Sequence, residues 1–285
     1  MKMSEVIGIV SGKGGVGKTT CLCCLGVALA ELGQKVALVD LNTGHGDLEF
    51  LFGMEANALY NISHIYSGMC RIEQVLLRDR RFGQLAILPA GSGGREISPD
   101  PDILGELCGV LRKKYDTVLL DCPAGTGESF KAAALWTDRL FLVTDPSLLS
   151  VKACLYLTSF LESAGIEEGE LLVNRVLPDR EKSGGRLAAD TISSILKLPL
   201  LGAIPEDDSI LTAQYKGMPG AVDVHTPAGD AFCRLGMRLT GQTPSGEKNG
   251  SIKLSASRQL PRRRGESAAV MGANRLKWMT ALLNV

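Results

Sequence analysis

No stretch of this sequence is apolar over the roughly 18 residues that a helix needs to cross a bilayer, although 45% of its 285 residues are hydrophobic. The first apolar run is short and leads directly into a glycine-rich loop, so it lacks the pattern of a secretory signal. We therefore expect a cytoplasmic protein whose membrane contact, if it has one, is peripheral and on the inner face of the cell membrane.

The sequence also lacks the spacings that indicate a metal site or a nucleophilic triad. Its three histidines, His45, His64 and His225, are scattered, with no H-x-x-x-H pair and no Ser/His/Asp constellation. Cys21 and Cys24 form a C-x-x-C pair, but none of the other six of the eight cysteines adds a second pair at metal-ligand spacing. We expect both to be small packing residues in a reducing compartment rather than metal ligands or disulfide partners.

A net charge is missing too, because 31 Lys and Arg balance 31 Asp and Glu. The balance is uneven along the chain. Residues 241–285 contain eight Lys or Arg and two acidic residues, a net charge of +6, which leaves −6 for the rest. An acidic body with a basic tail predicts that the tail meets an anionic surface.

What the sequence does contain is a regular alternation of apolar runs and helical segments. Continuous apolar runs at 36–39 and 117–120 are typical of parallel strands that are buried on both faces. The alternation predicts an α/β fold with a doubly wound, mostly parallel sheet and ligand sites at the carboxyl ends of its strands. We expect strands near 5–11, 35–40, 84–88, 116–120, 139–143, 169–174 and 200–204, and helices at 18–32, 101–114, 147–164, 186–197, 207–216 and 226–240.

Composition divides the chain into a folded domain over residues 1–240, a flexible basic linker over 241–272 and an amphipathic helix over 273–285. A short helix with Trp and Leu on one face, preceded by a basic segment, predicts an anchor at a membrane interface. Docking on the domain or on a partner protein, and disorder, remain alternatives. The apolar face of this helix consists of Leu276, Trp278, Met279, Leu282 and Leu283, with Val285 beside them.

The most specific motif lies between the first predicted strand and the first predicted helix. Gly12, Gly17, Lys18 and Thr19 match the phosphate-binding pattern G-x-x-x-x-G-K-[ST] in the context that it requires. Its glycines let backbone N–H groups turn inward around an anion, and the helix N-terminus adds partial positive charge. The expected nucleotide-binding residues of this loop are Gly12, Lys13, Gly14, Gly15, Val16, Gly17, Lys18, Thr19 and Thr20.

With its second lysine, Lys13, the loop resembles the deviant Walker A motif of the MinD/ParA family of P-loop ATPases. Further segments resemble the family in the same order: 39–44 its switch I, 48–53 and 87–91 two motifs of MinD members, 119–125 its Walker B and switch II, and 204–207 its adenine loop. The resemblance covers about residues 4–240 and implies a P-loop NTPase fold. The C-terminal amphipathic helix favours the MinD branch.

The resemblance implies ATP and Mg²⁺ as ligands, and a homodimer that forms with ATP bound. Lys13 would reach the partner's phosphates, so that hydrolysis depends on dimerisation, and Lys18 would hold its own. Thr19 and Asp121 would hold Mg²⁺, the alternative for Asp121 being a strand-end cap of a turn. The expected contacts to the base are Asn174, where a plain turn is the alternative, and Pro205, Glu206 and Asp207.

Switch I departs from the family pattern D-x-D, because Asp40 is followed by Asn42 in place of the second aspartate. An asparagine cannot carry the negative charge or act as a base toward the attacking water. The departure predicts slow hydrolysis with nucleotide binding intact, unless Asp47 substitutes for the missing carboxylate. The expected catalytic residues are Lys13, Lys18, Asp40, Asn42 and Asp121.

These features together predict a MinD-like ATPase that dimerises with ATP, binds the membrane and helps place the division septum. The resemblance implies a division inhibitor and an ATPase-activating protein as partners. One alternative is a ParA-like or flagellar-placement ATPase, in which basic patches bind DNA, but Trp278 and its leucine neighbours favour lipid. Another is a nucleotide-gated scaffold that scarcely hydrolyses ATP because of Asn42, and a metal-cluster carrier is disfavoured by the missing second C-x-x-C.

Overall fold

A single eight-stranded sheet organises the part of the chain that the computed structural model describes, residues 4–91, 97, 100–166, 169–177, 186–219 and 225–242. Its order is β3-β4-β2-β5-β1-β6-β7-β8, and only the short β3 runs antiparallel to its neighbour. The expected doubly wound, mostly parallel sheet is therefore confirmed. The strands are β1 (Glu5–Val10), β2 (Val36–Asp40), β3 (Leu77–Arg78), β4 (Leu85–Leu88), β5 (Thr117–Asp121), β6 (Arg139–Thr144), β7 (Gly169–Val176) and β8 (Leu200–Pro205).

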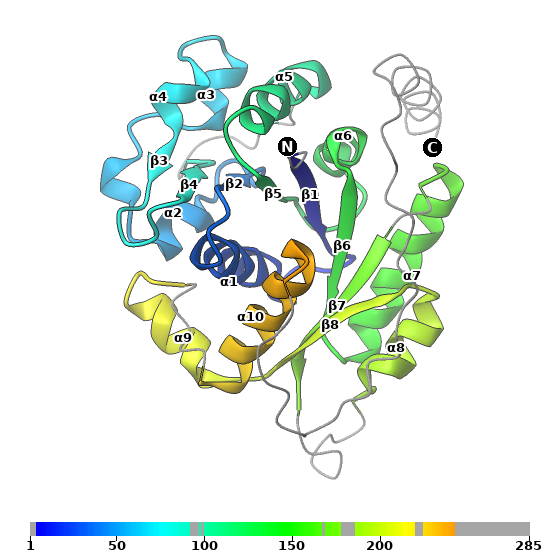
Figure 1. Cartoon of the computed structure of the whole chain (residues 1–285). Coiled ribbons are helices and arrows are strands. Elements are labelled where there is room, and N and C mark those ends of the chain that lie inside the picture. Colours follow the sequence, from blue (N-terminus) through cyan, green and yellow to red (C-terminus); the bar gives the residue numbers. More distant parts are fainter. Residues whose placement is uncertain are drawn as a thin grey trace.

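Helices cover both faces of this sheet (Figure 1). One face carries α1 (Lys18–Glu31), α2 (Asp47–Leu51), α9 (Asp208–Tyr215) and α10 (Pro227–Thr240). The other carries α5 (Pro101–Arg112), α6 (Glu128–Trp136), α7 (Leu148–Ser163) and α8 (Ala189–Leu196). Three short elements, η1 (Glu55–Asn57), α3 (Ile62–Tyr66) and α4 (Ile72–Val75), lie in the connection between β2 and β3.

The central strands are buried on both faces because alternate side chains enter two separate cores. Ile7 and Ile9 of β1 pack in the core beneath α1 and α10. Val6 and Val10 of the same strand pack in the opposite core, beneath α5, α6 and α7. This double burial explains why the strands appear in the sequence as continuous apolar runs rather than as alternating ones.

The predicted elements differ from the observed ones mainly where elements are short. The pattern did not predict the nine-residue α6. It also did not predict the small elements between β2 and β4, whose two to five residues are too few to show a period. The helix expected at 186–197 spans only Ala189–Leu196 and ends where Lys197 takes a left-handed φ of 55°. The asparagine cap of α3 and the proline start of α5 are local signals that fit the positions of those helices.

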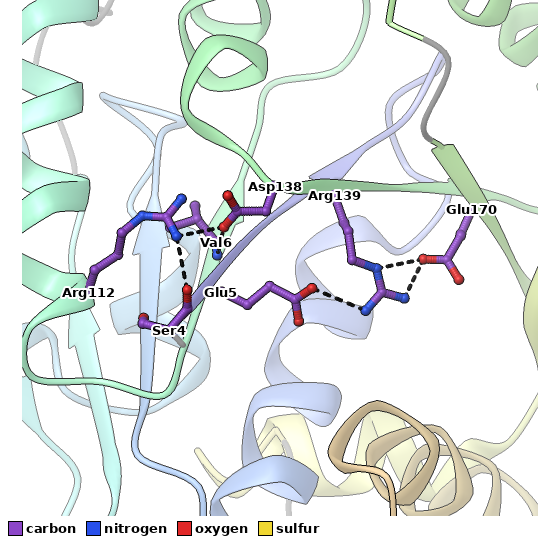
Figure 2. A network of polar contacts seen from close by, with 7 residues as sticks. All are labelled: Ser4, Glu5, Val6, Arg112, Asp138, Arg139 and Glu170. Carbon is purple, nitrogen blue, oxygen red and sulfur yellow. Dashed lines mark hydrogen bonds and ion pairs between the residues drawn. The ribbon is translucent and has the colours of Figure 1, made fainter. Parts of the chain in front are cut away.

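Ion pairs join the strand starts at the amino edge of the sheet (Figure 2). Arg139 at the start of β6 bonds Glu5 of β1 and Glu170 of β7. Arg112 at the end of α5 pairs with Asp138 at 2.6 Å and donates to the Ser4 carbonyl at 3.0 Å. The opposite, carboxyl edge is where the phosphate-binding loop leaves β1, so these ion pairs stabilise the sheet away from that loop.

The described residues end at 242, so the predicted linker, apart from its first two residues, and the predicted helix over 273–285 lie outside them. The expected membrane residues Leu276, Trp278, Met279, Leu282 and Leu283 lie outside them too. Among the helices that the structure describes, none has both the length and the apolar character to cross a membrane.

Candidate functional site

The glycine-rich loop leaves the end of β1 and turns directly into the first turn of α1. Gly15 and Gly17 adopt left-handed φ values of 80° and 91°, which a residue with a Cβ rarely takes. Gly17 is the N-cap of the 14-residue α1, and no side chain caps its first turn. The free N–H groups of this turn, together with the helix dipole, form the kind of site that binds phosphate.

Gly12 is required for a different reason, which is space. A Cβ at Gly12 would lie 2.3 Å from the carbonyl carbon and oxygen of Ala153 and 2.7 Å from the amide nitrogen of Cys154, both in α7. The loop therefore lies directly against the backbone of α7. By contrast, a Cβ at Gly14 would meet nothing within 4 Å.

The two functional side chains that follow the loop converge on Asp121 at the end of β5. The Lys18 ammonium lies 3.3 Å from Oδ1 of Asp121, and the Thr19 hydroxyl donates to Oδ2 at 2.5 Å. Asp121 is fully buried. Burial raises the pKa of this carboxyl, while the charge of Lys18 and the Thr19 hydrogen bond oppose the rise.

Asp40 lies beside Asp121, because these residues face each other in the register of β2 and β5. Its Oδ1 accepts the Asn42 N–H at 2.8 Å, and its Oδ2 accepts the Leu48 N–H at the start of α2 at 3.4 Å. Burial and the neighbouring Asp121 raise its pKa well above the usual value. Asp40 thus shapes the backbone of the predicted switch I, and it places the half-buried Asn42 next to the site.

Lys13 projects from the loop as an exposed side chain. Its carbonyl accepts the Ser11 hydroxyl at 2.9 Å, which fixes its backbone. Burial alone would raise the pKa of Asp145, but hydrogen bonds from Ser147 and the charge of Lys13 hold it below its usual value. Lys13 is therefore a surface cation near the end of β6, available to a ligand or to a second molecule.

Asn174, near the end of β7, holds the loop from the side. Its amide Nδ2 donates to the Val16 carbonyl at 2.9 Å, and the side chain is buried. A Cβ at Gly17 would lie 2.3 Å from the same Nδ2, so Gly17 also leaves room for Asn174. The predicted contact of Asn174 with a base stays a prediction, and the structure gives this residue a role in shaping the loop.

The segment Pro205, Glu206 and Asp207 joins β8 to α9. Asp207 is the N-cap of α9 and accepts the Ser209 N–H at 2.9 Å and the Ala228 N–H at 3.0 Å. Burial would raise the pKa of Asp207, but these hydrogen bonds lower it overall. Glu206 pairs with Arg186 at 2.8 Å on the surface. Asp207 therefore orders this turn, and the predicted base contacts of the segment stay predictions.

Several residues of the site carried no motif in the sequence. Gln214 of α9 donates to the Thr20 hydroxyl at 3.0 Å, and Glu49 of α2 accepts the Gly91 N–H at 2.9 Å. Asp79 and Arg81 join the loops at the ends of α2 and α9. Of these four residues only Glu49 and Asp79 are buried, and no pattern in the sequence shows which residues the four bind.

The cysteines of α1 are packing residues, as predicted. Cys21 and Cys24 are buried in the core between α1 and the sheet. Burial raises the pKa of Cys21 to about 12, and raises that of Cys24 well above its usual value. Both thiols therefore stay protonated at neutral pH and make poor nucleophiles or metal ligands.

A glycine loop at the end of a central parallel strand, with a buried aspartate at the end of the neighbouring strand, defines a P-loop nucleotide-binding protein. Residues 7–220 match the family model of the CobQ/CobB/MinD/ParA nucleotide binding domain. The chain belongs to this family.

Similar proteins extend the match over most of the chain. A putative septum site-determining protein MinD of Guillardia theta is 36% identical over 241 residues, which is 84% of this chain and 90% of that protein. In the MinC:MinD cell division protein complex of Aquifex aeolicus, the matching chain is 32% identical with a TM-score of 0.76, covering 87% of this chain and 100% of that one. The septum site-determining protein MinD of Pyrococcus horikoshii OT3, complexed with Mg-ADP, is 30% identical with a TM-score of 0.74, covering 83% and 96%.

Proposed function

We propose that this protein is an ATPase that uses ATP binding to switch between a cytosolic and a membrane-bound state and so helps place the division septum. The single observation that carries the proposal is the convergence of Lys18 and Thr19 on the buried Asp121, next to the uncapped first turn of α1. The names of the relatives, septum site-determining proteins, support the cellular role.

The residues of the loop have the chemistry to hold a triphosphate. Backbone N–H groups between Gly12 and Thr20 would bind phosphate oxygens, with the positive end of α1 behind them. Lys18 would exchange its ion pair with Asp121 for the β- and γ-phosphates, since a triphosphate is the stronger anion. Asn174 would keep the loop in shape through its bond to the Val16 carbonyl.

The residues also fit Mg²⁺, because the Thr19 hydroxyl and the Asp121 carboxylate are hard oxygen donors that lie side by side. Thr19 would hold the ion directly, and Asp121 would hold it through water. When bound, Mg²⁺ neutralises negative charge on the β- and γ-phosphates. Water would attack the γ-phosphorus, the bond between that phosphorus and the oxygen of the leaving ADP would break, and the water proton would pass to the phosphate product or to solvent.

The partner that completes the site would be a second copy of this chain. Lys13 is exposed at the carboxyl edge of the sheet, where it would reach the phosphates bound by a facing subunit. Positive charge supplied from the other subunit would stabilise the transition state only in the dimer. Hydrolysis would then separate the two subunits, because the dimer depends on bound ATP.

Membrane binding would follow from the same dimerisation. The predicted amphipathic helix over 273–285 is short, and one such anchor binds a bilayer weakly. Two anchors on one dimer act together, so that avidity exceeds the affinity of either. The membrane-bound dimer would recruit a division inhibitor, which a MinC:MinD cell division protein complex among the similar structures supports. A second partner would stimulate hydrolysis and release.

One observation favours a second function, a nucleotide-gated scaffold with little turnover. Asn42 occupies switch I where the family pattern has an aspartate, and its backbone N–H donates to the Asp40 carboxylate. An asparagine there leaves binding and dimerisation possible while it removes the charge that would orient water.

The first experiment is co-sedimentation of the full chain with anionic and with neutral liposomes, in ATP, in ADP and without nucleotide. A variant that ends at Gly272 is the matched control, because it lacks only the predicted anchor. ATP-dependent binding to anionic vesicles that is lost on truncation supports the switch. No binding in any state overturns the anchor, and salt-sensitive DNA binding by the same samples would favour the ParA-like alternative.

An ATP turnover assay on the same samples separates the ATPase from the scaffold. ATP turnover that rises when liposomes are added supports the ATPase. ATP-dependent liposome binding without measurable turnover supports the second.

A further inference from the structure

Arg81 lies on the turn between β3 and β4, outside the phosphate-binding loop. Its guanidinium donates two hydrogen bonds to Asp79, from Nε to Oδ1 at 2.9 Å and from Nη2 to Oδ2 at 2.6 Å. The Asp79 side chain is only 2% exposed. Hydrogen bonding to Asp79 raises the pKa of Arg81, so the guanidinium is charged and its plane is fixed.

The remaining N–H groups of Arg81 hold two separate loops. Nη1 donates to the Gly217 carbonyl at 2.7 Å, and Nη2 donates to the Phe52 carbonyl at 2.8 Å. Phe52 is the C-cap of α2, the helix that follows switch I. Gly217 follows α9, the helix that Asp207 caps on the predicted base side. One guanidinium thus joins the ends of both helices.

The two loops also approach each other closely at glycines. Gly53 and Gly217 both have a φ of 64°, and a Cβ on Gly217 would lie 3.4 Å from the Cα of Gly53. No side chain separates the two backbones at this point. The two loops are therefore close neighbours, and Arg81 is hydrogen-bonded to both.

Each helix is bound to the nucleotide site at a second point. On the α9 side, Gln214 donates to the Thr20 hydroxyl in the first turn of α1. On the α2 side, the Leu48 N–H donates to Asp40, which neighbours Asp121 in the sheet. The contacts form a ring through α1, α9, Arg81, α2 and the two strand ends.

We propose that Arg81, oriented by Asp79, is a positioning residue that couples α9 on the base side to α2 and switch I on the γ-phosphate side. The proposal rests on the proposed ATPase function and deepens it. Nucleotide bound against α1 and α9 would hold Asp40 and Asn42 in register with the phosphates through this ring. Without the link, ATP still binds to the loop, but switch I is set correctly in a smaller fraction of molecules.

The test replaces Arg81 by lysine in the full chain. Arg81→Lys keeps a cation for Asp79 but has no planar fork for the two carbonyls. We expect kcat for ATP hydrolysis to fall about fivefold while KM changes less than about twofold. The matched control is Arg80→Lys at the exposed neighbouring position, which should leave both constants unchanged.

A second variant approaches the link from its other end. Gln214→Ala removes the contact of α9 with Thr20. If the ring acts as a unit, the double variant Arg81→Lys/Gln214→Ala should lose no more kcat than Arg81→Lys alone. Additive losses would mean two independent effects and would overturn the coupling. A merely structural Arg81 would lower the urea midpoint and leave kcat per folded molecule unchanged.

Hydrogen exchange provides a readout that needs no turnover. With a non-hydrolysable ATP analogue, the amides of α1 and α2 should both gain protection in the wild type, and only those of α1 in Arg81→Lys. Equal protection of α2 in the two proteins overturns the coupling.

The wild type separates the two proposals. If the wild type hydrolyses ATP and Arg81→Lys has the same kcat, the role of Arg81 is overturned and the proposed function stands. A wild type that binds the analogue without turnover counts against hydrolysis, and the exchange data then decide the coupling. A wild type that binds no nucleotide overturns both.

Discussion

Gly12 and Gly14 belong to the same loop, but only the first of these two glycines is required by close packing. Gly12→Ala should lower the free energy of unfolding by about 1–3 kcal/mol, because its Cβ would overlap the backbone of Ala153. Gly14→Ala should change it by less than about 0.5 kcal/mol, because a Cβ there meets nothing. Urea denaturation without nucleotide measures both, and equal losses would contradict the close packing of loop and α7.

Asn42 is the residue of the site that we expect to limit the rate of ATP hydrolysis. Asn42→Asp should raise kcat for ATP by about tenfold or more, because a carboxylate can orient and accept a proton from the attacking water. The affinity for ATP should change little, since the phosphate-binding loop is untouched. Steady-state turnover with Asn42→Ala as control measures the effect. An unchanged or lower rate in Asn42→Asp would remove Asn42 from the water-positioning role.

At the scale of elements, the two edges of the sheet have separate tasks. The carboxyl edge contains carboxyl groups whose burial lowers the stability of the fold, above all Asp40 and Asp121. The amino edge joins α5 and strands β1, β6 and β7 through the ion pairs of Arg112 and Arg139. Binding and stabilisation therefore depend on different residues.

Arg139→Ala tests this division. Arg139 joins β1, β6 and β7 and lies 4.9 Å from the centre of the Phe141 ring. Its loss should lower stability by about 1 kcal/mol and leave nucleotide affinity unchanged. The control is Arg234→Ala, which breaks an exposed pair within α10 and should cost about 0.5 kcal/mol or less. A weakened nucleotide affinity in Arg139→Ala would show that the edges are not independent.

At the scale of the whole molecule, the raised pKa of Asp40 makes folding depend on pH. The folded protein holds the Asp40 proton more tightly than the unfolded chain does, because burial and Asp121 disfavour the charge. Stability from this group is therefore greatest below the unfolded pKa, about 4, and falls as pH rises toward the folded pKa.

Asp40→Asn should remove that loss and so stabilise the nucleotide-free protein progressively as the pH rises from about 4 toward neutrality, since each pH unit below the folded pKa costs the wild type about 1.4 kcal/mol. Urea denaturation across this range measures the difference from wild type. Parallel curves for wild type and Asp40→Asn would show that the buried Asp40 carboxyl is not the source of the pH dependence.

The sequence by itself determined the sheet, the phosphate-binding loop and the family, because each depends on local patterns. Apolar runs mark strands buried on both faces, and Gly15, Gly17, Lys18 and Thr19 stand at fixed offsets from one strand and one helix. The buried Asp121 was predictable for the same reason, since it ends such a run.

Only the tertiary structure decided which distant residues meet. Asn174 lies 158 positions from the carbonyl that it binds, and Arg81 lies 136 positions from Gly217, so no local pattern records either contact. The short elements that carry Arg81, Glu49 and Phe52 have no readable period of their own. They take their positions from the packing of loops against α9 and the sheet, and that packing exists only in the folded chain.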